Sequence, residues 1–160
     1  MEPMDNMLMR VTNNFIDWGN ANGAGMSPLK LQKLMYLVYA RYLYSQREPL
    51  FEERFEKWPK GPVLRDLYEM LKVFGGSNIE EPLTDVRGKI ISIQLGSGPY
   101  TSAFREVAFR YGWNSANELI RLTHSGPPGA DFHTAWAKTP EYGDYLGYKD
   151  ILEDGGRFFA

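Results

Sequence analysis

The chain has 160 residues, a formal net charge of −2 at pH 7, a hydrophobic fraction of 43% and no cysteine. This length predicts one domain spanning residues 1–160. The absence of cysteine excludes a disulfide scaffold and thiolate metal sites, and the slightly acidic net charge argues against a nucleic-acid partner. Because the longest apolar run, residues 34–40, is too short for a membrane span and residues 1–5 lack the basic start of a signal peptide, we expect a cytoplasmic protein without a membrane partner.

Two helices are predicted in the first third of the chain. Residues 7–18 place apolar side chains at helical spacing, and the Asn and Gly residues at 20–25 are expected to end this helix. Ser27 and Pro28 predict a second start, because Ser caps free amides and Pro suits the first helical position. That helix continues to about Arg47, and its nearly continuous apolar surface predicts a place at the centre of the core. Its solvent side is expected at Lys30, Lys33, Arg41 and Tyr44.

The middle of the chain is predicted to contain one helix and one strand. Residues 48–62 are expected to be irregular, because the residue before each of their prolines is disfavoured in a helix. A helix is expected over 62–74, where apolar residues recur at helical spacing before two glycines. After a loop at 77–88, the alternating, isoleucine-rich residues 89–95 predict a short strand.

The last third is predicted to hold two helices followed by a segment rich in Pro, Gly and aromatic residues. Residues 101–111 have a helical pattern, and Ser115 with Glu118 predicts a capping box at the start of the next helix. The final 35 residues are expected to be mostly loop, with one short helix near 149–153. The fold class that follows is mainly α: a compact helical domain with a long central helix and a small β element.

Residues 138–160 are interpreted as an aromatic, acidic C-terminal tail. Gly155 and Gly156 are expected to form a flexible joint, because glycine is conformationally free. Phe158 and Phe159 are costly to leave in water, so we expect them to dock either on this domain or on a partner.

The residue types needed for catalysis or metal binding do not stand at diagnostic spacings. His124 and His133 are separated by a Pro-Pro-Gly segment, unlike the one-turn spacing of a helical metal pair. Gly96 and Gly98 follow the predicted strand as in a dinucleotide fingerprint, but one strand cannot form a doubly wound sheet. We therefore predict no enzyme, no catalytic residue, no metal and no cofactor, and keep a small-molecule enzyme and a DNA-binding regulator as alternatives.

Aromatic content and charge distribution both point to contact with another protein. Aromatic residues make up 14% of the chain, and large amphipathic rings in irregular segments either fill a core or stand at the centre of an interface. Residues 26–74 carry an excess of basic side chains and residues 126–160 an excess of acidic ones. These are either ordinary solvated faces or a basic surface that meets an acidic partner.

Residues 27–36, Ser-Pro-Leu-Lys-Leu-Gln-Lys-Leu-Met-Tyr, resemble the opening helix signature of the Panacea antitoxin domain. The resemblance continues in residues 49–51, in Glu-Lys-Trp-Pro-Lys-Gly-Pro-Val at 56–63, in Leu-Tyr at 67–68 and in Leu-Thr-His at 122–124. It covers residues 7–137. This family includes the SocA-type proteolytic adaptor and phage-associated GepA-like proteins. One departure is that Trp136 lies farther beyond the Thr-His pair than the family's Pro-Trp does.

The resemblance implies a non-enzymatic, cytoplasmic antitoxin that neutralises a cognate toxin by direct protein–protein binding. The alternative within the family is an adaptor that delivers a toxin to an ATP-dependent protease. Either reading implies partner-binding residues at the positions that match the family's motifs. These are Gln32, Lys33, Trp58, Lys60, Gly61, Pro62, His124 and Trp136. Taken singly, each of them could instead be purely structural.

Overall fold

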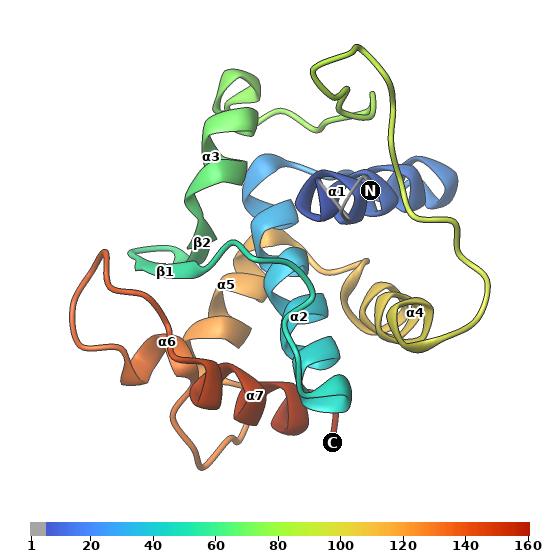
Figure 1. Cartoon of the computed structure of the whole chain (residues 1–160). Coiled ribbons are helices and arrows are strands. Elements are labelled where there is room, and N and C mark those ends of the chain that lie inside the picture. Colours follow the sequence, from blue (N-terminus) through green and yellow to red (C-terminus); the bar gives the residue numbers. More distant parts are fainter. Residues whose placement is uncertain (1–5) are drawn as a thin grey trace.

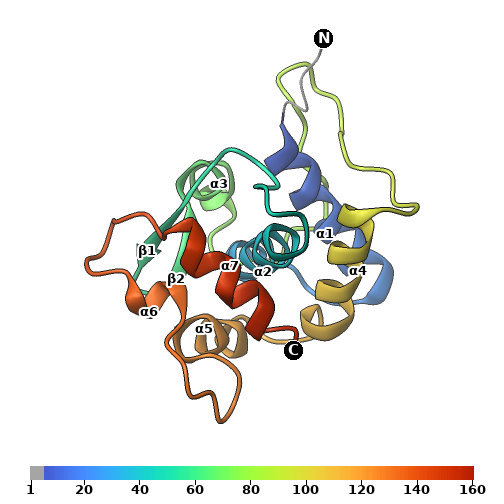
Figure 2. The same ribbon diagram turned by 60° about the horizontal axis from the view of Figure 1, so that its bottom comes forward.

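Helix α2 (Pro28–Gln46) lies at the centre of the computed structural model, which describes residues 6–160. Figure 2 views this helix nearly end-on, with the other elements around it. The Ser27 hydroxyl accepts a hydrogen bond from the Lys30 backbone N–H at 3.2 Å, and Pro28 opens the helix. Every residue from 30 to 40 is buried. The predicted central helix and its start are therefore confirmed.

The elements around α2 make the protein mainly helical, as predicted. A tilted contact between Phe15 and Phe104, with ring centroids 4.6 Å apart, joins the first and fourth helices beside α2. None of the helices among residues 6–160 is both long and apolar enough to cross a membrane. The surrounding helices are α1 (Met7–Asn22), α3 (Arg65–Leu71), α4 (Pro99–Tyr111), α5 (Ala116–Ser125), α6 (Ala135–Lys138) and α7 (Tyr148–Arg157), with a 3-10 turn at Lys72–Phe74.

The small β element is a hairpin of β1 (Phe55–Trp58) and β2 (Gly61–Leu64), paired antiparallel with Trp58 opposite Gly61. Residues 48–62 were expected to be irregular. Residues 48–54 are irregular, but the strands at 55–58 and from residue 61 contradict the rest of that expectation, and Pro62 lies in a strand rather than opening a helix. Pro62 is tolerated in β2 because the backbone of Lys57, its cross-strand partner, bonds outward to Gly143 and Asp144. The helix α3 begins only at Arg65.

The strand expected at 89–95 does not form, and that prediction is wrong. Residues 75–98 instead make a long loop along α1, with an isolated bridge between Thr84 and Ile90. The Asn13 amide donates to the Leu83 and Ile91 carbonyls at 2.9 and 2.7 Å. This buried side chain therefore takes backbone groups that a partner strand would otherwise satisfy.

Helix α7 corrects the expectation of a flexible joint at Gly155 and Gly156. Gly155 and Gly156 lie inside this helix, so they do not form a flexible joint. A Cβ built on Gly155 would collide with the Ala40 carbonyl of α2, which shows why glycine allows the two helices to pack closely. Phe158 is only 2% exposed and docks on this domain. The C-terminal segment is therefore part of the core rather than an appendage.

Local sequence signals predicted several of the other helix ends correctly. The capping box of Ser115 and Glu118 is present in both directions, as predicted. Helix α4 matches the expected helix closely, whereas α1 continues four residues beyond the predicted end at residue 18 before Gly23 adopts a left-handed φ of 69°. The expectation that Lys30 and Lys33 face solvent is wrong, since both are buried.

Candidate functional site

A groove of about 590 Å³ opens between the first turns of α2, the hairpin turn and α3, which lie side by side in both views of the fold. Among the described residues, its lining is mostly apolar and aromatic, and the charged side chains in it are lysines. It is lined by Pro28, Leu29, Gln32, Trp58, Pro59, Lys60, Val63, Tyr68, Leu71, Lys72, Gly75 and Gly76.

Gln32 holds the hairpin against α2. Its amide nitrogen donates to the Leu64 carbonyl at 3.0 Å, and its amide oxygen accepts from the Leu64 N–H at 2.9 Å. Lys33 donates to the Pro62 carbonyl at 2.9 Å. Two neighbouring side chains of one helix therefore take the place of a further strand along the outer edge of β2.

The outer edge of β1 is closed as well. Its backbone bonds to residues 143–146, including an N–H of Lys57 that donates to the Asp144 carbonyl at 2.8 Å. Sheet edges with free N–H and C=O groups invite strand addition, and both edges of this hairpin are occupied. The hairpin therefore presents side chains rather than free backbone groups at its surface.

Lys33 and Gly61 fit each other beneath the groove. Lys33 is 0% exposed and forms no ion pair within residues 6–160, and burial lowers the pKa of its amine to about 7. Gly61 has a φ of +114°, and a Cβ there would lie 2.9 Å from Lys33 Cε and 3.0 Å from Thr123 Oγ1. Only glycine therefore suits this turn position.

Trp136 braces the hairpin from the side opposite α3. Its indole N–H donates to the Trp58 carbonyl at 2.8 Å. Its ring stacks on His124 with centroids 3.7 Å apart and an interplanar angle of 9°, and Lys57 Nζ lies 4.3 Å from the Trp136 centroid. Burial and the charges of Lys33 and Lys57 lower the pKa of His124, so its ring is neutral at pH 7.

The aromatic rim of the groove is held by an ion pair. Trp58 and Tyr68 lie with ring centroids 5.0 Å apart, and the Trp58 indole donates to Glu56 Oε1 at 3.1 Å. Arg65 donates to both oxygens of Glu56, at 2.9 and 3.1 Å. Burial acts to raise the pKa of Glu56, but the hydrogen bonds from Arg65 and Trp58 outweigh it and lower this pKa, so the carboxylate stays ionised.

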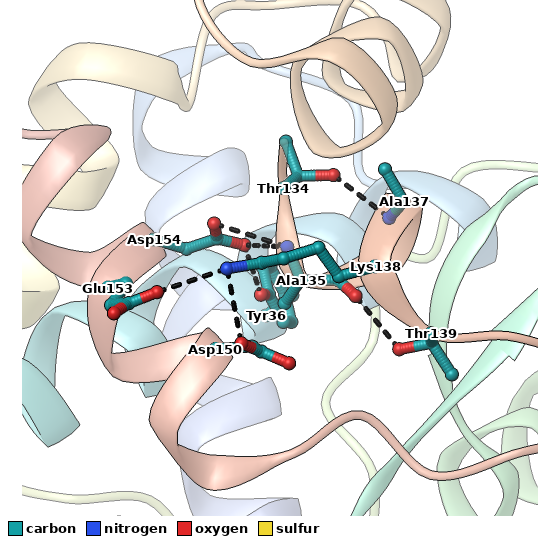
Figure 3. Close-up of polar contacts among 9 residues, drawn as sticks. All are labelled: Tyr36, Thr134, Ala135, Ala137, Lys138, Thr139, Asp150, Glu153 and Asp154. Atoms are coloured by element: carbon teal, nitrogen blue, oxygen red, sulfur yellow. Dashed lines mark hydrogen bonds and ion pairs between the residues drawn. The ribbon is translucent and has the colours of Figure 1, made fainter. Parts of the chain in front are cut away.

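A second polar cluster positions α6, which carries Trp136 (Figure 3). The Tyr36 hydroxyl donates to Asp154 Oδ2 at 2.6 Å, and the Ala135 N–H donates to the same oxygen at 3.1 Å. Burial raises the pKa of Asp154 to about 6, although both hydrogen bonds oppose the rise. Nearby, Lys138 forms ion pairs with two carboxylates of α7 at 3.0 and 3.1 Å. Helices α2, α6 and α7 are thereby joined through one buried carboxylate.

The eight residues predicted for partner binding gather around the hairpin. Gln32, Trp58 and Lys60 line the groove. The other five lie below or behind the groove surface: Lys33, Gly61, Pro62, His124 and Trp136. Lys33 in particular has no exposed surface, so we expect any part it plays in binding to be indirect, through the placement of the hairpin.

The sequence analysis placed Tyr68 in a motif of the family resemblance but not among the partner-binding residues, and it missed the polar cluster around Asp154. Tyr68 follows the core residue Leu67 in α3, so its side chain points away from the core, and that one-residue offset was the available signal. Asp154 meets Tyr36 across 118 residues of sequence, for which no local pattern exists. Among residues 6–160, no three His, Cys, Asp or Glu side chains are grouped so that they could hold a metal ion.

Comparison with known proteins links this surface to a family. Residues 31–128 match the family model described as antitoxin SocA-like, Panacea domain. The chain is 29% identical over 124 residues to antitoxin SocA of Caulobacter vibrioides (strain NA1000 / CB15N), an alignment that covers 74% of this chain. The aligned region spans 65% of the length of that relative. No solved structure matches the chain. The matched residues include most of α2, the hairpin, α3 and the lining of the groove between them except Pro28 and Leu29.

Proposed function

The chain belongs to the family of SocA-like antitoxins with a Panacea domain, and from that membership we propose that it neutralises a cognate toxin by direct protein–protein binding. The proposed action is non-enzymatic, takes place in the cytoplasm and uses the groove between α2, the hairpin and α3 as the contact surface.

The observation that carries this proposal is an apolar groove with a rigid aromatic rim. Tyr68 is 44% exposed beside Trp58, and large rings on a fixed backbone are the side chains that dominate protein interfaces. The bonds from Gln32 and Lys33 hold the hairpin in place before a partner arrives. A surface that is already ordered loses little conformational entropy on binding, which favours tight association.

Co-expression with the toxin encoded beside this chain tests the proposal. We expect the chain to restore growth, and a tagged copy to retain the toxin through purification as a stable complex. Tyr68→Ala is expected to weaken toxin binding at least about tenfold in calorimetric titration, because truncating a central interface aromatic costs more than about 1.4 kcal/mol.

Phe109→Ala provides the matched control. Phe109 is an aromatic residue that is 82% exposed on α4, outside the groove, and its truncation is expected to leave toxin binding unchanged. If the toxin does not bind the wild-type chain, direct neutralisation is wrong. If Phe109→Ala loses binding while Tyr68→Ala keeps it, the groove is the wrong surface.

The toxin's lifetime separates neutralisation by blocking from delivery to an ATP-dependent protease. For blocking, we expect the toxin to accumulate in the complex at an undiminished half-life. A half-life that shortens only in the presence of this chain and an active protease would support the adaptor instead.

A further inference from the structure

We propose that the groove accepts a toxin segment in which an apolar side chain is flanked by a carboxylate. This inference rests on the proposed function, because it names the chemistry of the segment that the antitoxin would bind. It is carried by the shape of the groove, by the sign of its charges and by the closed edges of the hairpin.

The floor of the groove fits an apolar side chain. Leu29, Val63 and Leu71 supply aliphatic surface, and the rings of Trp58 and Tyr68 form one wall. Binding of an aliphatic or aromatic side chain there removes apolar surface of both the side chain and the groove from water. This burial is the usual driving force at the centre of an interface.

The two charged side chains that line the groove in residues 6–160 are both positive. Lys60 is exposed and forms no ion pair within the described part of the chain. Lys72 pairs with Glu69 at 2.9 Å, and both side chains are half exposed or more, so an incoming carboxylate displaces a weak surface pair. The nearby Glu56 is already held by Arg65. The groove therefore attracts an acidic segment and repels a basic one.

The backbone of the hairpin limits how the segment binds. Gln32 occupies the Leu64 N–H and carbonyl, and Lys33 occupies the Pro62 carbonyl. An extended segment consequently finds no free edge on which to add a strand. Recognition depends on side chains, so the apolar and acidic residues of the segment determine its affinity.

The test uses the full-length chain and the toxin that co-purifies with it. We expect the double variant Lys60→Glu with Lys72→Glu to bind the toxin at least about tenfold more weakly than wild type at low salt, and the difference to shrink as salt rises. The matched control is Lys89→Glu with Lys149→Glu, which makes the same change in net charge at two exposed lysines outside the groove. Thermal unfolding verifies that both variants are folded.

Charge reversal on the toxin identifies the carboxylate. Among toxin variants with single Asp or Glu residues changed to Lys, we expect one to bind wild type weakly and to recover at least about fivefold in affinity for Lys60→Glu. If the wild-type chain binds no toxin, the proposed function itself fails. If the toxin binds but the groove variant matches the control, or no reversal restores binding, the acidic segment is wrong and direct neutralisation still stands. One further outcome would overturn this inference: groove variants that bind the toxin normally but, unlike wild type, no longer shorten its half-life. The segment that binds the groove would then come from the protease and not from the toxin.

Discussion

At the scale of single residues, the central helix is notable for the polar groups it buries. Lys30, Gln32, Lys33 and Tyr36 lie within the apolar surface of α2, and each bonds to a group on another element. Lys30, for example, donates at 2.6 Å to the carbonyl of Gly112, at the negative end of α4. Unpaired buried polar groups are costly, so these bonds determine which elements pack against α2 and in which register.

Gln32→Ala is expected to lower the free energy of unfolding by about 1–3 kcal/mol, because it leaves the Leu64 N–H and carbonyl without their partners. Urea unfolding measures the loss. The control is Gln46→Ala at the exposed end of the same helix, which is expected to change stability by no more than about 0.5 kcal/mol. Equal effects of the two substitutions would show that Gln32 does not secure the hairpin.

Asp154→Asn is expected to change how stability depends on pH. The pKa of Asp154 is about 6 in the folded protein against 3.8 for a free side chain, so between these values the folded state keeps a proton that the unfolded state has released. The free energy of unfolding of the wild type should therefore fall, relative to the variant, by up to about 3 kcal/mol as pH rises from about 4 to about 6, and level off above.

Asn is a close control for shape, because its carbonyl can accept the same bonds from Tyr36 and Ala135. Any other effect of the amide on stability adds an offset that does not depend on pH, so only the change of the difference with pH reports the pKa of Asp154. Urea unfolding at several pH values gives both curves. Parallel curves from pH 4 to pH 7 would contradict a raised pKa at Asp154.

At the scale of elements, the hairpin turn depends on the absence of a side chain at Gly61. Gly61→Ala is expected to lower the free energy of unfolding by about 2–4 kcal/mol. A φ of +114° strains an L-residue, and the new Cβ would contact Lys33 and Thr123 too closely. Differential scanning calorimetry or urea unfolding measures the change.

Gly98→Ala separates strain from crowding. Gly98 has a similar φ of +111°, but apart from its chain neighbours no atom of residues 6–160 lies within 4 Å of the position its Cβ would take. Gly98→Ala is expected to lower the free energy of unfolding by about 1–3 kcal/mol, less than Gly61→Ala does. If the two variants are equally destabilised, crowding against Lys33 contributes nothing.

At the scale of the whole molecule, the C-terminal segment completes the core rather than extending it. Helix α7 packs along α2, Asp154 bonds Tyr36, and residues 143–146 close the outer edge of β1. A chain ending after residue 137 is expected to show no cooperative thermal transition, because one side of α2 and one edge of the hairpin would be exposed together.

Thermal unfolding followed by circular dichroism measures the cooperativity of the 1–137 chain. The control is a chain that lacks only the exposed Ala160, which is expected to unfold like the full chain. Cooperative unfolding of the 1–137 chain near the wild-type midpoint would show that the family-like segment folds alone and that residues 138–160 are a dispensable tail.

Local sequence signals by themselves determined the helical framework. Ser27-Pro28 and the Ser115–Glu118 capping box set helix starts correctly, because a cap satisfies backbone groups only a few residues away. The apolar surface of α2 likewise predicted its central place, because burial of such a surface is favourable whatever covers it. The family resemblance, read from contiguous motifs, agrees with the matched family model over residues 31–128.

Tertiary structure alone decided the groove, the hairpin and the packing of α7. Lys30 and Gly112 are 82 residues apart and Tyr36 and Asp154 are 118 apart, so no local pattern distinguishes a buried lysine from an exposed one. The isoleucine-rich stretch at 89–95 has strand propensity, but a strand needs a partner, and Asn13 supplied the hydrogen bonds instead. Gly155 looked like a joint because glycine is flexible in isolation, whereas beside Ala40 its missing side chain allows a rigid helix contact.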